Sequence, residues 1–177
     1  HWPTTARLNE LIVKEFEPLA SASLYIALDL SSKANVGQGK HSTFEYAVRI
    51  AASIGRYACN NGMPTRMSGE GARSLAIASG FGEAHFGNML EVLAVVAADG
   101  EVPYARVLQN VAMNCRLGQT VVVFLSESDE AVATTLQSIA MLRARGANVL
   151  AITFDRTSFL MQAVTPAPAS LWTGLLD

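Results

Sequence analysis

Acidic and hydroxyl side chains follow two strongly apolar stretches of the chain. Asp29 and Ser31 come just after the first stretch, and Glu127 and Asp129 come just after the second. In an open α/β sheet, ligands bind beyond the carboxyl ends of the strands, where the strand order reverses. Carboxylate and hydroxyl oxygens at that edge are the donors that Mg²⁺ prefers. The two groups therefore indicate a candidate metal or ligand site.

The same residues also have an ordinary structural interpretation. Asp29 and Ser31 are residue types that hydrogen-bond to their own loop, and Ser128 and Asp129 are types that cap a helix. From spacing alone, we favour this local role.

Motifs for nucleotide binding and for hydrolysis are incomplete or missing. The segment 37–40 (GQGK) resembles the end of a phosphate-binding loop, which requires Gly-x-x-x-x-Gly-Lys-Ser/Thr. Ala34 stands where the first Gly is needed, and His41 follows the Lys. A Gly-x-Ser-x-Gly nucleophile motif does not occur in the sequence. The three histidines share no spacing with a nucleophile or a metal motif, so we predict that the chain is not an enzyme.

The composition describes a folded and nearly neutral protein. Of the 177 residues, 50% are hydrophobic and 16% are charged, and the net charge is −2. Intrinsic disorder requires fewer apolar residues and a higher net charge. Nucleic-acid binding relies on a positive field that this chain does not have. We therefore predict one folded domain with appended segments and no nucleic-acid partner.

The two cysteines lie far apart in the sequence, and each falls in a helical pattern. A disulfide framework needs denser, paired cysteines, and a zinc site needs Cys or His residues at short spacing. We predict that Cys59 and Cys115 are reduced thiols packed as small apolar side chains. This prediction fits a reducing compartment.

Apolar runs alternate with helical patterns along the chain. Runs such as LYIAL and TVVVFL are typical of strands that are buried on both faces. Ser42 and Glu45 form the capping box that begins a helix. The pattern predicts a three-layer α/β fold with a mainly parallel, twisted, Rossmann-like sheet, helices on both faces and one antiparallel hairpin strand. The predicted strands are 24–28, 64–68, 73–78, 120–125 and 148–154, with 24–28, 120–125 and 148–154 buried; the predicted helices are 42–61, 88–98, 103–115 and 129–145.

The chain divides into three parts by this pattern. Residues 1–22 form an N-terminal segment, residues 23–160 form the main domain, and residues 161–177 form an irregular C-terminal extension. The longest apolar runs are far shorter than the ~20 residues that a membrane-spanning helix needs, so we expect no membrane insertion by this chain. Because it begins with His1, we expect it to be a piece of a longer protein.

Several segments resemble a bacterial family known as domain of unknown function 58. That family has a Trp-x-x-Ser/Thr-Ala-Arg segment, then a short stretch that ends in acidic residues, then a strand that carries Asp-x-Ser. The matching segments here are Trp2 to Arg7, Val13 to Glu17 and Asp29 to Ser31. The run VVVFLSESDE is similar to the family's strand that ends in Ser-Asp before a helix.

The resemblance implies a region similar to the von Willebrand factor A domain, which is mostly a binding module. Some of these domains hold Mg²⁺ through Asp-x-Ser-x-Ser, a Thr from a second loop and an Asp from a third. Here Asp29 and Ser31 match, Lys33 replaces the second Ser, the loop 100–103 has no Thr, and Glu127 stands about where the Asp is expected. We therefore expect a degenerate metal site without a bound ion, in which the Lys33 ammonium replaces the charge of the cation.

The resemblance also implies a cellular setting. Relatives carry membrane helices ahead of this region, and their genes lie near AAA+ ATPases of the MoxR type. We expect a non-catalytic protein-interaction domain on the cytoplasmic side of a membrane-anchored protein, with a MoxR-type ATPase as partner. The expected binding residues lie in solvated loops and are Asp29, Ser31, Lys33, Glu127 and Asp129.

Two other functions stay open at this point. One is an adhesion-type module whose ligand binding requires Mg²⁺. The other is a small hydrolase or transferase that uses the acidic crevice, although we can name neither its base nor its nucleophile.

Overall fold

The computed structural model describes residues 23–126 and 129–164. Five strands form one sheet in the order β3-β2-β1-β4-β5. The strands are β1 (Leu24–Ala27), β2 (Thr65–Glu70), β3 (Ser74–Gly80), β4 (Thr120–Leu125) and β5 (Asn148–Thr153); the helices are η1 (Gly39–His41, a 3-10 turn), α2 (Thr43–Asn60), α3 (Gly82–Val95), α4 (Tyr104–Asn114), α5 (Asp129–Ala144) and α6 (Arg156–Val164).

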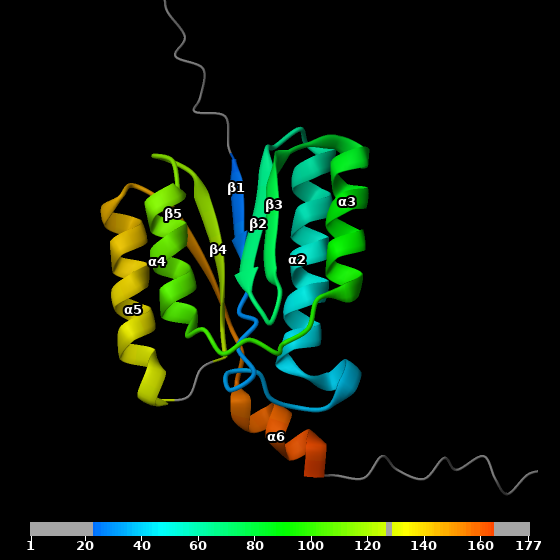
Figure 1. Cartoon of the computed structure of the whole chain (residues 1–177), viewed down its shortest axis with the longest axis vertical. Helices are drawn as coiled ribbons and strands as arrows, with labels where there is room; N and C mark the ends of the chain where they lie inside the picture. Colours follow the sequence, from blue (N-terminus) through cyan, green and yellow to red (C-terminus); the bar gives the residue numbers. More distant parts are fainter. Residues whose placement is uncertain (1–22, 127–128, 165–177) are drawn as a thin grey trace, which may run out of the picture.

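The sheet is mainly parallel and lies between two helical layers. β1 is parallel to β2 and to β4, β5 is parallel to β4, and β3 is antiparallel to β2. Helices α2 and α3 cover one face, and α4 and α5 cover the other (Figure 1). The predicted three-layer α/β fold with one antiparallel hairpin strand is confirmed.

The central strand β1 is apolar throughout because both of its faces are covered. Leu24 and Ile26 join the core on the α2 and α3 side. Tyr25 and Ala27 join the core on the α4 side. Successive side chains of a strand point to opposite faces, so an unbroken apolar run is required where both faces pack against helices.

Local sequence signals fix several element boundaries. The Ser42 hydroxyl accepts a hydrogen bond from the Glu45 amide at 3.2 Å, as the predicted capping box requires. Pro103 directly precedes α4, where its missing N–H costs nothing. The strand predicted at 120–125 has the same bounds in the structure.

Other boundaries differ from the prediction. Helix α3 begins at Gly82, six residues before the predicted start, and ends at Val95 rather than at residue 98. Residues 82–87 include two glycines, which weaken a helical pattern in the sequence. Burial of Phe86 in the core holds this first part of the helix in place.

The C-terminal region holds two further differences. The strand 148–154 was expected to be buried, but β5 lies at the edge of the described sheet, and Leu150 is 50% exposed. Helix α6 crosses the expected boundary between residues 160 and 161, so residues 161–164 are helical rather than irregular. The segments expected at 1–22 and 165–177 lie outside the described residues. Among the described helices, none combines the length and the hydropathy needed to cross a bilayer.

Candidate functional site

The candidate site begins where β1 and β4 separate. Ala27 is the last residue of β1 that pairs with β4, opposite Val123. The Tyr104 hydroxyl of α4 contacts both strands at this point, donating to the Ala27 carbonyl at 2.7 Å and accepting from the Phe124 amide at 3.1 Å. This buried hydroxyl thus joins α4 to β1 and β4 near the carboxyl edge of the sheet.

The loop after β1 is built around Asp29. Its side chain is 3% exposed, and its Oδ1 accepts a hydrogen bond from the Ser31 amide at 2.9 Å. The Asn35 side-chain amide donates to the carbonyl oxygens of Asp29 at 3.1 Å and of Ser31 at 2.9 Å. The Asp29 bond forms an Asx turn, and the Asn35 side chain adds two further hydrogen bonds to the same backbone. This is the local structural role that the spacing of Asp29 and Ser31 favours.

The end of the same loop is tied to the start of α2. The fully buried Thr43 hydroxyl accepts from the Val36 amide at 3.0 Å and contacts the Asn35 side-chain oxygen at 3.2 Å. The polar side chains of the loop therefore hold its backbone in one shape.

A second loop, between α3 and α4, lies against the loop after β1. The Gly100 amide donates to the Leu30 carbonyl at 2.8 Å, and the Gly100 carbonyl accepts from the Ser32 amide at 3.0 Å. A Cβ atom at position 100 would collide with the Glu70 carbonyl at the end of β2. Only glycine allows this close approach.

A third contact comes from α6, which crosses the carboxyl edge of the sheet (Figure 1). The Arg156 guanidinium donates to the carbonyl oxygens of Ala34, in the loop after β1, and of Ser126, after β4. Phe159, one turn further along α6, meets the Tyr46 ring edge-on at 5.4 Å. Arg156 therefore joins the loop after β1 to the segment after β4.

Sequence reasoning missed both Tyr104 and Arg156. Their roles depend on contacts with residues 20 to 122 positions away, which no local pattern reports. One local signal was present for α6, because Asp155 is a typical helix-capping residue. Its carboxylate accepts from the Thr157 amide at 3.0 Å and from the Ser158 hydroxyl.

The expected site residues have different surroundings. Asp29 is buried, contrary to the solvated position expected for it, Ser31 is half-buried, and Lys33 is exposed. No ion pair joins Lys33 to Asp29 among the residues that the structure describes. Glu127 lies outside the described residues, and Asp129 is the first residue of α5. β1 and β4 are adjacent and parallel, so Asp29 and the carboxyl end of β4 lie at the same edge of the sheet.

Two of the positions that the magnesium pattern requires are engaged or substituted in the described residues. Oδ1 of Asp29 accepts the Ser31 amide hydrogen, and Lys33 stands at the position of the second hydroxyl ligand. No group of three His, Cys, Asp or Glu side chains suited to a metal occurs within 23–126 and 131–161. The Arg156 guanidinium places a positive charge between the loop after β1 and the segment after β4, and this charge opposes a second cation nearby.

The sequence matches one family model, described as "Protein of unknown function DUF58", over residues 1–156. The chain belongs to this family. The Uncharacterized protein YeaD of Bacillus subtilis (strain 168) is 31% identical over 105 residues, which are 59% of this chain. The match spans about a quarter of that relative, 24% of its length.

Solved structures resemble the fold. Proximal thread matrix protein 1 from the mussel byssus aligns with a TM-score of 0.55 at 14% identity, over 75% of this chain and 38% of its own. A von Willebrand factor type A protein from Catenulispora acidiphila aligns at 13% identity and a TM-score of 0.43, over 81% of this chain and 41% of its own. The manganese-loaded TRAP protein of Plasmodium vivax aligns at 13% identity and a TM-score of 0.45, over 85% of this chain and 65% of its own.

The strand order agrees with the fold that the family resemblance implies. The sheet has a central β1, a reversal of strand order between β1 and β4, an antiparallel β3 and helices on both faces. The expected von Willebrand factor A-like α/β fold is confirmed.

Proposed function

We propose that this chain is a non-catalytic protein-interaction domain that binds its partner at the carboxyl edge of the sheet. The observation that carries the proposal is the rigid loop after β1. Asp29 and Asn35 fix its backbone from within, and Arg156 fixes it from α6. Ser32 and Lys33 are left exposed at its tip. A loop held in one conformation loses little entropy when a partner binds.

A shallow hollow next to this loop favours a protein ligand. It has a volume of about 430 Å³ and lies between the loop 32–45 and the segment 96–98. Its wall combines the polar Ser32 and Asn35 with the apolar Val36, Val96 and Ala97. Mixed polar and apolar lining of this kind suits one or two side chains of a docking protein.

The hydrogen bonds that the polar side chains of this loop make support a non-catalytic role. Thr43, Asn35 and Asp29 are engaged in shaping the loop. A hydrolase would require a nucleophile within hydrogen-bond reach of a base, with the base oriented by a third group. Thr43, Asn35 and Asp29 instead make hydrogen bonds that hold the loop backbone.

We propose that binding at this edge does not require Mg²⁺. Among the described residues Asp29 is the one buried carboxylate, and this together with the Arg156 charge supports the proposal. In a thermal-unfolding assay, addition of MgCl₂ is expected to leave the melting temperature unchanged. A saturable rise that Asp29→Ala abolishes would favour the Mg²⁺-dependent adhesion module.

The partner we propose is a MoxR-type AAA+ ATPase, with the chain acting on the cytoplasmic side as part of a membrane-anchored protein. Support comes from membership of the DUF58 family and from the family setting that the sequence resemblance implies. This pairing would serve the assembly or maturation of client proteins.

A site-specific crosslink tests the proposal directly. A photoreactive amino acid would be placed at Lys33, and separately at Tyr57, which is 67% exposed at the opposite end of α2. With the purified MoxR-type ATPase of the same organism and ATP, we expect a crosslinked product from position 33 and little from position 57. Equal yields from both positions, or none from position 33, would overturn the proposed surface.

A further inference from the structure

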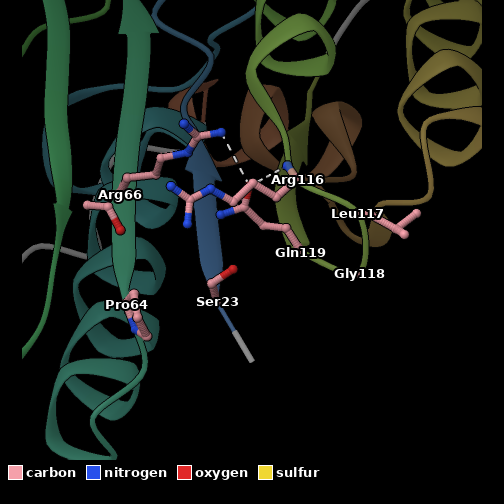
Figure 2. Close-up of a pocket in the computed structure, with 8 residues that line it drawn as sticks. Ser23, Pro64, Arg66, Arg116, Leu117, Gly118 and Gln119 are labelled. Carbon is pink, nitrogen blue, oxygen red and sulfur yellow. Dashed lines mark hydrogen bonds between the residues drawn. The ribbon is translucent and has the colours of Figure 1, made fainter. Parts of the chain in front are cut away.

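A small hollow at the amino edge of the sheet brings two arginines together. Its volume is about 210 Å³, and Figure 2 shows the side chains around it. Arg66 comes from β2, and Arg116 comes from the turn between α4 and β4. The hydroxyl residues Ser23 and Ser79 also line the hollow, and no Asp or Glu is among its lining residues.

Arg66 is held firmly in this place. Its guanidinium carbon lies 3.8 Å from the centre of the Tyr25 ring. Its Nη2 donates to the Asn114 carbonyl and to Oε1 of Gln119 at 3.2 Å. Its Nε is buried and has no hydrogen-bond partner in the described part of the chain. A buried donor without an acceptor is costly and therefore uncommon.

Arg116 lies across the hollow from Arg66 and bonds to the same Gln119 oxygen. Its backbone amide donates to Oε1 of Gln119 at 3.2 Å, so one oxygen atom anchors both arginines. In Figure 2 the side chain of Arg116 extends toward Arg66 rather than away from the hollow. Neither guanidinium has an ion pair among the described residues. Within the described residues, two like charges thus lie on the same hollow without an acidic side chain lining it.

We propose that this arginine pair binds a phosphate group. A guanidinium presents its donors in a planar fork that matches two oxygens of a phosphate, and the exposed Arg116 can offer such a fork. Arg66 adds its remaining Nη1 donors, and the two guanidinium groups together supply a charge of +2. The serine hydroxyls add neutral donors for the remaining oxygens. The ligand is either free phosphate or the phosphate of a small ester. The site lies at the edge of the sheet opposite to the proposed protein-binding surface, so neither proposal depends on the other.

Titration calorimetry with inorganic phosphate tests the site. The ionic strength is kept constant with NaCl, so that general screening does not change. We expect saturable binding with one site per chain. Arg116→Gln removes one fork at an exposed position and is expected to weaken binding at least about fivefold. Arg106→Gln, which changes an exposed arginine of α4 away from the hollow, is the matched control and is expected to bind as the unmodified chain does.

Two further arms refine the test. Acetate is expected to bind more weakly than phosphate, because it carries less charge and fewer oxygens. Free phosphoserine distinguishes the sources: tighter binding than inorganic phosphate indicates an ester ligand, and weaker binding indicates the free ion. No saturable heat with phosphate, equal affinity of Arg116→Gln and the unmodified chain, or equal binding of acetate and phosphate would each overturn the proposal.

Discussion

The Arg156 guanidinium donates a hydrogen bond to the Ser126 carbonyl and so joins the first turn of α6 to the segment that leaves β4. A second bond from the same nitrogen reaches the Ala34 carbonyl in the loop after β1. Backbone carbonyls beyond the end of a sheet must find a hydrogen-bond donor or remain in water. One cation therefore satisfies both sides and fixes the distance between them.

Replacing Arg156 should loosen the loop after β1 without unfolding the protein. Arg156→Gln is expected to lower the free energy of unfolding by about 1–2 kcal/mol, because two charge-assisted bonds are lost from a half-buried site. Hydrogen exchange should quicken at the amides of the loop 30–37 while it stays slow in β4. Arg106→Gln on the exposed side of α4 serves as the control. Unchanged exchange in the loop would show that Arg156 does not hold it.

The Tyr104 hydroxyl should contribute to stability through the two backbone groups it satisfies. Tyr104→Phe removes a hydroxyl that bonds to both the Ala27 carbonyl and the Phe124 amide at a buried site, and is expected to cost about 1–3 kcal/mol in urea unfolding. Tyr57→Phe, at an exposed site, should cost almost nothing. Equal midpoints for both variants would contradict this role.

The sequence predicted the scaffold better than the site. Strand 120–125 and the Ser42 cap could be located because periodicity and capping act over a few residues. Arg156 and Tyr104 act through contacts with carbonyls that are distant in sequence, so nothing near them in the chain reveals those partners. The shape of the loop that follows Asp29 was missed for a related reason, since its backbone is held by Gly100 and Thr43, which lie further along the chain.

Because Asp29 is buried, its removal should affect stability before binding. Asp29→Ala is expected to lower the free energy of unfolding by about 1–3 kcal/mol, since the Ser31 amide loses its acceptor. Asp29→Asn keeps an oxygen at that position and should recover part of the loss. Chemical denaturation of the three proteins measures both effects. Stability equal to that of the unmodified chain in Asp29→Ala would contradict the structural role.

Lowering the pH should weaken the Asp155 cap at the start of α6. Hydrogen bonds from the Ser158 hydroxyl and the Thr157 amide lower the pKa of the Asp155 carboxyl. The charged cap is therefore fully present above the ordinary aspartate pKa of about 3.9 and is lost as the pH falls through the lowered value. The NMR signal of the Thr157 amide should shift in that range, and Asp155→Asn should abolish the shift. A midpoint above 3.9 would contradict the assigned cause.

The most direct test of the account is the affinity of a Lys33→Glu variant for the MoxR-type ATPase. Lys33 is exposed at the tip of the rigid loop, so reversing its charge should leave the melting temperature unchanged. Arg145→Glu, at the exposed end of α5, is the matched control at the other edge of the sheet. We predict that Lys33→Glu weakens binding by about tenfold or more while Arg145→Glu binds as the unmodified chain does. Equal affinity of the two variants would contradict the assignment of the carboxyl edge as the binding surface.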